Sequence, residues 1–298
     1  MNLFTGLSAF PLTPLADDVL DERAFAGLIE RLAAAGVDSI TVLGSTGSYA
    51  YLSAEERARA ARLAVAHAVQ TPVFVGVGAL RTSQVLANAE RAEASGAAGL
   101  LLAPMTYQPL TEDDVLGLFR ALVQHTELPV ILYDNPSTTG FTFSTELYGR
   151  IAALPGIASI KIPPPPLDPA AARARIEEVR DTVPDHVTVG VSGDPAAATG
   201  LLAGADAWYS VIAGTLPAPA LDITRAAQQG RIHDAQEQSR RLTPLWDLFA
   251  QHGSLRVVAS IAEHLGLVPR DCLPLPIRPL PRAERDRILE VVEELGFG

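Results

Sequence analysis

Short apolar runs of four or five residues recur along the first 212 positions of the chain, separated by longer segments with helical periodicity. Several runs are apolar at nearly every position instead of alternating with polar residues, which is typical of strands buried on both faces. There are eight such runs, at residues 7–10, 39–43, 73–77, 99–103, 130–133, 159–162, 187–191 and 208–212.

The segments between the runs carry signals for the starts and ends of helices. Ser53 with Glu56, and Thr111 with Asp114, stand three residues apart at the start of helical stretches, as the partners of a capping box do. A weak internal repeat at 35–38, 95–98 and 203–206 places a glycine where a helix would end before the next strand. The pattern therefore predicts strands and helices in alternation.

Eight strand–helix units predict a closed parallel (β/α)8 TIM barrel. The alternative is an open doubly wound sheet, which usually has fewer strands and needs a switch point. After residue 216 the pattern predicts helices over 217–230, 231–252, 254–266 and 281–295, with no strand between them and a proline-rich linker before the last. We therefore expect a barrel core over 1–216, and the final barrel helix with a C-terminal helical region over 217–298.

Composition excludes several classes of function. The net charge is −11 with no basic run, which disfavours nucleic acid as a partner. No window of about 18 apolar residues predicts a membrane span, and the first residues lack the charged and apolar regions of a signal peptide. The single cysteine, Cys272, fits a reducing compartment. These observations predict a cytoplasmic protein.

The most distinctive residue is Lys161, the only lysine in the chain; the other 22 basic residues are arginine. Arginine can replace a lysine that serves as a surface charge, but it stays protonated and cannot attack a carbonyl. Lys161 lies late in the sixth apolar run, where Ile160, Ile162 and neighbouring strands would bury its amine and lower its pKa. It is therefore a candidate Schiff-base nucleophile, although codon preference could also explain the arginine bias.

Other polar residues follow the predicted strands, and the carboxyl ends of barrel strands form the active site in such folds. Ser45, Thr46 and Gly47 follow the second strand, where hydroxyls and backbone N–H groups could hold a carboxylate. Tyr133 ends the fifth strand and could move protons for a lysine beside it. An ordinary strand-to-helix turn and a packing tyrosine are the alternatives for these residues.

Competing chemistries have weaker support in the sequence. Arg81 stands at the third glycine position of the only segment that resembles a dinucleotide-binding fingerprint. The six histidines show no spacing typical of metal ligands. We therefore expect no cofactor and no metal.

Taken in order, four motifs resemble the family of Schiff-base class I aldolases that includes dihydrodipicolinate synthase and N-acetylneuraminate lyase. The motifs are Pro11-Leu12-Thr13-Pro14, Gly44-Ser45-Thr46-Gly47, Tyr133-Asp134-Asn135-Pro136 with Gly140, and Ser159-Ile160-Lys161. The resemblance implies a TIM barrel with C-terminal helices that forms a homotetramer or homodimer. It implies that Lys161 forms an imine with pyruvate or another 2-oxo acid. It also implies that Tyr107 reaches a neighbouring subunit's site. The residues that we expect to be catalytic are Lys161, Tyr133, Ser45 and Tyr107, and those expected to bind substrate are Ser45, Thr46, Gly47, Thr138 and Ile212.

Three positions depart from the family pattern. Ser48 replaces the usual glutamate after the glycine-rich turn, and Thr138 replaces the arginine with which synthase members hold the second substrate's carboxylate. Four prolines at 163–166 replace polar residues that commonly follow the lysine. We therefore expect the imine chemistry to be retained and the second-substrate pocket to differ, with aspartate semialdehyde disfavoured.

The sequence thus predicts a lyase that makes or breaks a C–C bond of a 2-oxo acid, with an aldehyde as the second partner. Two alternatives stay open. The same imine could dehydrate a 2-keto-3-deoxy sugar acid, or the chain could be a non-catalytic homologue that binds a small acid.

Overall fold

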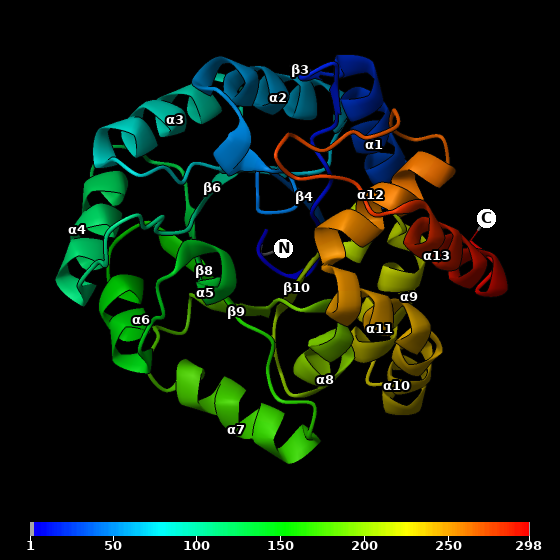
Figure 1. The fold of residues 1–298 in the computed structure, drawn as a ribbon. Coiled ribbons are helices and arrows are strands. Elements are labelled where there is room, and N and C mark those ends of the chain that lie inside the picture. Colours follow the sequence, from blue (N-terminus) through cyan, green and yellow to red (C-terminus); the bar gives the residue numbers. More distant parts are fainter. Residues whose placement is uncertain (1–2, 298) are drawn as a thin grey trace.

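The computed structural model describes residues 3–297, and in them eight parallel strands close into a barrel surrounded by helices (Figure 1). The first strand pairs with both the second and the last, which completes the ring. The predicted (β/α)8 barrel is confirmed, and the doubly wound alternative is wrong. The barrel strands are β1 (Gly6–Ala9), β4 (Ser39–Val42), β5 (Val73–Gly76), β6 (Gly99–Leu102), β7 (Val130–Tyr133), β8 (Ile157–Ile162), β9 (Thr188–Val191) and β10 (Ala207–Ser210).

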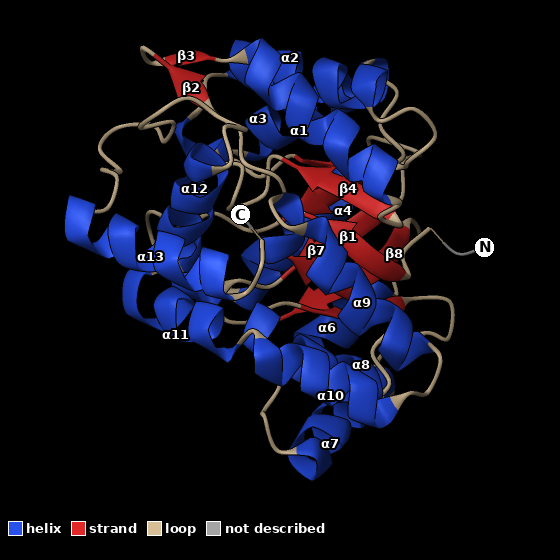
Figure 2. Cartoon of the chain, turned by 90° about the vertical axis from the view of Figure 1, so that its right-hand side faces the viewer, coloured by secondary structure: helices blue, strands red, loops and turns tan. Residues whose placement is uncertain are grey.

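Helices cover the outside of the barrel and continue beyond it. Those between the strands are α1 (Glu22–Ala35), α2 (Ala54–His67), α3 (Thr82–Ala94), α4 (Glu112–Val123), α5 (Pro136–Thr139), α6 (Thr145–Ala152), α7 (Pro169–Arg180) and α8 (Ala197–Leu202). After β10 come α9 (Pro217–Gln228), α10 (Ile232–Arg241), α11 (Thr243–His252), α12 (Ser254–His264) and α13 (Arg282–Glu294). A hairpin of β2 (Leu15–Ala16) and β3 (Val19–Leu20) lies outside the barrel sheet. Figure 2 shows α11, α12 and α13 beyond one end of the barrel.

One predicted helix, over 231–252, is two helices in the structure. They meet at Leu242, whose ψ of 3° lies outside the helical range. Pro244 stands in the first turn of α11. Because proline has no backbone N–H and its ring clashes with the preceding turn, a continuous helix cannot pass through it. The break lets α11 leave the direction of α10 and turn toward the barrel mouth.

Alternation along the strands separates the barrel interior from the helix layer. Val130 and Leu132 of β7 pack in the large core between the sheet and the helices, whereas Ile131 and Tyr133 belong to a smaller cluster inside the barrel. Side chains two residues apart in a strand point to the same face. Lys161, whose Cα is paired with that of Tyr133, therefore points into the barrel.

The internal repeat has a structural role at the amino end of the strands. Asp38 accepts hydrogen bonds from the Leu7 N–H at 2.7 Å and from Arg225 of α9 at 2.8 Å. Asp206, at the matching position of the third repeat, accepts one from the Val189 N–H at 2.8 Å and pairs with Arg180 of α7. Each aspartate thus ties a neighbouring strand and an outer helix to the start of its own strand, at the end of the barrel associated with stability.

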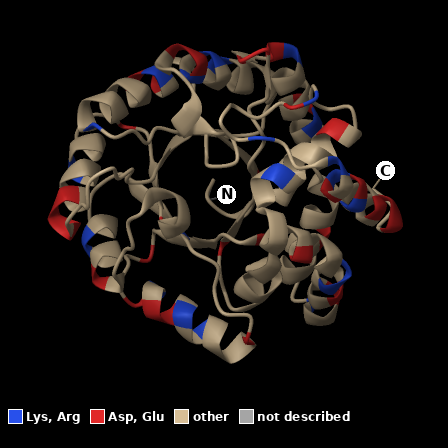
Figure 3. Cartoon of the chain, viewed as in Figure 1, with Lys and Arg blue, Asp and Glu red and all other residues tan. Residues whose placement is uncertain are grey.

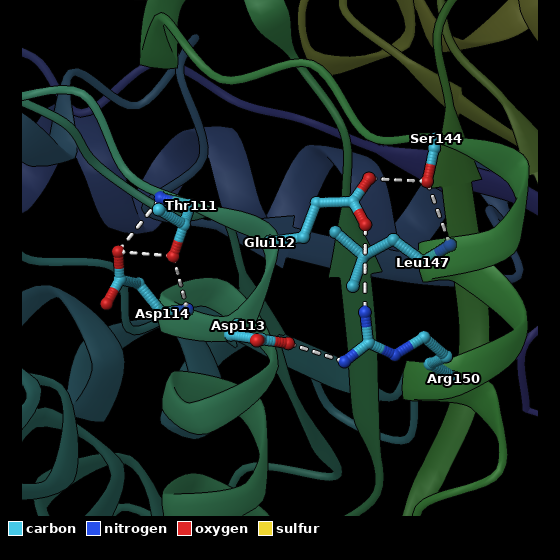
Figure 4. Close-up of polar contacts among 7 residues, drawn as sticks. All are labelled: Thr111, Glu112, Asp113, Asp114, Ser144, Leu147 and Arg150. Carbon is cyan, nitrogen blue, oxygen red and sulfur yellow. Dashed lines mark hydrogen bonds and ion pairs between the residues drawn. The ribbon is translucent and has the colours of Figure 1, made fainter.

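Neighbouring outer helices are joined by polar contacts, as Figure 4 shows for α4 and α6. Thr111 and Asp114 form the predicted capping box at the start of α4. The Ser144 hydroxyl, which caps α6, donates to Glu112 at 2.6 Å, and Arg150 of α6 pairs with Asp113 at 2.6 Å. These exposed pairs orient the helices but contribute little stability each.

Charged residues lie mainly on the outer helices in the view down the barrel (Figure 3). Within residues 3–297, no helix is both long enough and apolar enough to cross a membrane.

Candidate functional site

A cavity of about 460 Å³ opens at the carboxyl ends of the strands, within the range of roughly 300–1,000 Å³ typical of small-molecule sites. Lys161 lies in its wall, as do residues that follow β4, β7, β9 and β10. Helices α11 and α12 supply a further part of the wall. The side chains that line the cavity include those of Ser45, Thr46, Tyr133, Asn135, Ser137, Thr138, Lys161, Pro164, Ser192, Asp194, Pro195, Tyr209, Val211, Trp246, Phe249, Ser254 and Leu255.

Aromatic rings surround the Lys161 amine. Its Nζ lies 3.9 Å from the centre of the Phe10 ring, 4.0 Å from that of Tyr133 and 5.8 Å from that of Tyr209. The side chain is 2 % exposed. The rings take the place of water around the amine and offer no strong hydrogen-bond acceptor in return.

This burial lowers the pKa of Lys161 from 10.5 to about 7, and the Asp194 carboxylate opposes the shift by favouring the ammonium. A large part of the amine is therefore neutral, and nucleophilic, near pH 7. The expectation that Ile160 and Ile162 bury the amine is wrong. Both pack in the core outside the barrel, because adjacent residues in a strand point to opposite faces.

Tyr133, Ser45 and Asn135 form a hydrogen-bonded triangle next to the amine. The Asn135 amide donates to the Tyr133 hydroxyl at 2.7 Å and to the Ser45 hydroxyl at 3.1 Å, and the two hydroxyls lie 3.3 Å apart. Burial raises the pKa of Tyr133 to about 12, so the phenol keeps its proton at neutral pH. The triangle provides a protonated group beside Lys161 with a second hydroxyl connected to it.

The turn after β4 has an unusual backbone. Leu43 and Ser48, at either end of it, have φ angles of +58° and +52°, in the left-handed region that most side chains avoid. Such strain is often found at functional sites, where the surrounding structure holds it in place. Here it turns the chain sharply from β4 so that Ser45 and Thr46 line the cavity.

Asp194, after β9, is a buried carboxylate in the cavity wall. It accepts hydrogen bonds from the Ile212 N–H at 2.7 Å, the Trp208 indole N–H at 3.0 Å and the Val211 N–H at 3.2 Å. Burial raises its pKa, and these hydrogen bonds oppose the shift. The carboxylate thereby fixes the chain after β10 and faces the same cavity as Lys161.

The structure brings together Lys161, Tyr133, Ser45, Thr46 and Thr138 from the residues expected at the site. Thr138 lies at the exposed rim of the cavity. Its hydroxyl donates weakly to the Asn135 carbonyl, at 3.4 Å.

The other three expected residues do not line the cavity. A side chain at Gly47 would approach the Leu43 nitrogen to 3.0 Å, so a residue without one suits this turn. Ile212 is fully buried in a short 3-10 helix after β10, not in the strand, and only its N–H reaches the site, through Asp194. Tyr107 is 86 % exposed. A role for Tyr107 across subunits remains a prediction.

One of the four prolines after β8 lies in the cavity wall. Pro164 lines the cavity and packs against Gly193, where a side chain would approach the proline ring to 2.5 Å. Gly193 has a φ of +79°, which favours glycine further. The run thus makes this side of the site stiff and apolar.

The sequence assigns no role to several residues of the site. Asn135 and Asp194 follow predicted strands, which places them at the barrel mouth but does not indicate what they do there. Phe10 also ends the first apolar run, but its contact with the amine depends on closure of the barrel. Trp246 and Phe249 come from α11, and no local pattern connects them with the site.

The fold and this cavity define a lyase of the (β/α)8-barrel class. The chain belongs to the dihydrodipicolinate synthetase family, whose sequence profile matches residues 3–295, and with it to the class I aldolase group.

Three enzymes named as synthases are similar to this protein over nearly the whole chain. The crystal structure of dihydrodipicolinate synthase from Agrobacterium tumefaciens is 45% identical, with a TM-score of 0.95 and 99% of each chain covered. The 4-hydroxy-tetrahydrodipicolinate synthase of Escherichia coli O139:H28 is 29% identical over 299 residues, covering 99% of this chain and all of the relative. A dihydrodipicolinate synthase from Acinetobacter baumannii, solved with pyruvate, is 26% identical with a TM-score of 0.89, and the match covers 99% of this chain and 100% of that one.

Proposed function

We propose that this protein is a Schiff-base lyase that acts on pyruvate or a closely related 2-oxo acid. The observation that carries the proposal is the buried Lys161 amine, with a pKa of about 7, in a cavity that the hydroxyl-bearing residues Ser45, Thr46 and Tyr133 also line. The Acinetobacter relative was solved with pyruvate, which supports the choice of 2-oxo acid.

In the proposed reaction, Ser45 and Thr46 hold the substrate carboxylate with hydroxyl and backbone N–H groups. The neutral amine of Lys161 attacks the 2-oxo carbon, and one of the amine protons passes to the carbonyl oxygen to form a carbinolamine. Tyr133 then donates a proton to the departing hydroxyl, which leaves as water. The protonated imine withdraws electrons from C3, so that C3 can lose a proton or a carbon substituent.

Borohydride reduction in the presence of pyruvate tests this proposal. Because Lys161 is the only lysine, peptide mapping by mass spectrometry can assign a reduced adduct either to it or to the α-amino group. We expect an adduct on Lys161 of the parent protein, and none at position 161 of a Lys161→Met variant treated in the same way. An intact parent protein that shows no adduct on Lys161 with any 2-oxo acid would refute the proposal.

Turnover separates the enzyme from a protein that only binds a small acid. We expect pyruvate to be consumed when an aldehyde is added, or released from a 4-hydroxy-2-oxo acid. An imine that forms without any turnover of such compounds would favour the binding protein. Loss of water from a 2-keto-3-deoxy sugar acid, with no C–C bond change, would favour the dehydratase.

We also propose that the protein assembles as a homo-oligomer in which Tyr107 contacts a neighbouring subunit. Its 86 % exposure in the single chain supports this, since a tyrosine so exposed has little packing of its own. A monomer in analytical ultracentrifugation at micromolar concentration would contradict it.

A further inference from the structure

The cavity has an apolar half that the proposed imine chemistry does not use. Trp246 and Phe249 of α11 and Leu255 of α12 line it, together with Val211 and Pro195. The rings of Trp246 and Phe249 lie 5.6 Å apart between centres and are tilted by 59°. The Trp246 indole N–H donates to the Ser239 carbonyl at 3.1 Å, so its hydrogen-bonding group is already occupied. A substrate would therefore contact this half of the cavity through apolar surface and not through hydrogen bonds.

The charges in the cavity do not suit a second carboxylate. Among the described residues that line it, Lys161 and Asp194 are the only ionisable groups besides the tyrosines, and no arginine is among them. Once the imine has lost a C3 proton, the enamine that attacks the second substrate is neutral, so Lys161 offers no cation at that step. A second carboxylate would therefore lie near Asp194 without a cation of its own, and a buried charge without a partner is costly.

The hydroxyls in the cavity are also partly committed. Ser137 donates to the Asn135 side-chain oxygen at 2.9 Å, and Ser192 donates to the Ile162 carbonyl at 2.7 Å. Each can still accept a hydrogen bond, but neither has a free proton to donate. A polyhydroxylated sugar chain needs many donors and acceptors, and of the three described serines that line the cavity outside the turn after β4, only Ser254 has a hydroxyl proton that is not already donated.

From these contacts we infer that the carbonyl partner is an uncharged aldehyde with an aromatic or other apolar group. This inference rests on the proposed function and specifies its second substrate. The apolar group would lie against Trp246, Phe249 and Leu255, with its carbonyl carbon toward the imine. Burial of a ring there gains hydrophobic and aromatic contacts that a short charged aldehyde cannot make.

The reaction would be an aldol addition. The imine of pyruvate loses a proton from C3 to give an enamine, and C3 then bonds to the aldehyde carbon. The electron pair of the aldehyde C=O moves to its oxygen, which takes up a proton. Water then hydrolyses the imine, which frees the Lys161 amine and releases a 4-hydroxy-2-oxo acid that contains all atoms of pyruvate and the aldehyde.

The test compares two aldehydes at saturating pyruvate. Benzaldehyde represents the uncharged aromatic class and succinic semialdehyde the carboxylate-bearing class, with the product quantified by mass spectrometry. We expect kcat/KM for benzaldehyde to exceed that for succinic semialdehyde by at least about tenfold. Equal or greater efficiency with succinic semialdehyde, or no product from benzaldehyde, would overturn the inference.

Two variants and a matched control test whether this cavity causes the preference for benzaldehyde. Leu255→Ser should lower kcat/KM for benzaldehyde by roughly tenfold and leave that for succinic semialdehyde within twofold. Leu267→Ser, at a half-buried leucine outside the cavity, is the matched control and should leave both values unchanged. Thr138→Arg adds a cation at the exposed rim of the cavity. It should raise kcat/KM for succinic semialdehyde and so narrow its difference from kcat/KM for benzaldehyde. If Leu255→Ser lowers both values equally while folded, the apolar half does not select the substrate.

Borohydride trapping with pyruvate distinguishes failure of the aldehyde assignment from failure of the lyase proposal. An adduct on Lys161 with the wrong aldehyde preference overturns only the choice of aldehyde. Absence of the adduct from the folded protein overturns the lyase proposal and the aldehyde assignment with it.

Discussion

Replacing Lys161 by methionine should stabilise the protein at neutral pH and progressively less at alkaline pH. The folded state lowers the pKa of this lysine from 10.5 to about 7, so burial disfavours its protonated form. Below pH 7 the Lys161 amine is charged in both the folded and the unfolded protein, and the destabilisation caused by Lys161 is at its full value. This destabilisation disappears as the pH rises toward 10.5. Each pH unit between these values changes the free energy of unfolding by about 1.36 kcal/mol. From pH 7 to 9.5 the lysine contribution therefore changes by about 3 kcal/mol.

Urea denaturation of the parent and Lys161→Met at pH 7 and 9.5, at one protein concentration, measures this contribution. Methionine has a similar length and no charge, and any gain from its apolar side chain is the same at both pH values. Titrating groups that do not interact with Lys161 contribute equally to both proteins and cancel in the difference. We expect the stabilisation by Lys161→Met to fall by about 3 kcal/mol between pH 7 and 9.5. A stabilisation that is independent of pH, or that grows with pH, would refute the assignment of a lowered pKa to Lys161.

Three further predictions concern the same site. The rate of imine formation with pyruvate, followed by rapid borohydride quenching, should rise with pH up to about 7 and then level off, because only the neutral amine attacks; a rate independent of pH from 5 to 9 would contradict this. Tyr133→Phe should lower that rate by about 100-fold, the usual scale for loss of a general acid, with an unchanged circular dichroism spectrum; a rate within twofold of the parent's would exclude Tyr133 as the proton donor. Asp194→Asn should reduce the free energy of unfolding by about 1–3 kcal/mol, because a buried amide cannot satisfy the three N–H donors. The same substitution should move the midpoint of the pH–rate profile to lower pH, because the Asp194 carboxylate favours the ammonium form of Lys161. A midpoint at higher pH would be evidence against this electrostatic interaction.

Much of the barrel was predictable because its signals are local. Strands buried on both faces are apolar throughout, and a capping residue or a glycine marks where each helix starts or ends. The same locality explains the one wrong helix boundary. The apolar spacing over 231–252 continues past Leu242, whereas Pro244 interrupts the helix through backbone geometry that spacing does not record.

The candidate site was only partly predictable. Lys161, Tyr133 and Ser45 follow or end predicted strands, so the barrel topology alone brings them to one mouth. The surroundings of the amine were assigned to the wrong residues, since Ile160 and Ile162 are its neighbours in sequence but not in space. Phe10 and Tyr209 desolvate it from other strands.

The order of residues is enough to establish the class of fold, the end of the barrel that holds the chemistry, and the one side-chain amine able to attack a carbonyl. These follow from periodicity along the chain and from the chemical types of residues. The reactivity of that amine and the nature of the cavity around it depend on how the chain folds in three dimensions. Desolvation of Lys161 depends on rings that arrive from separate strands when the barrel closes, and the apolar wall depends on where α11 and α12 fold back over the mouth. Both result from contacts between residues far apart in the chain, which local patterns do not encode.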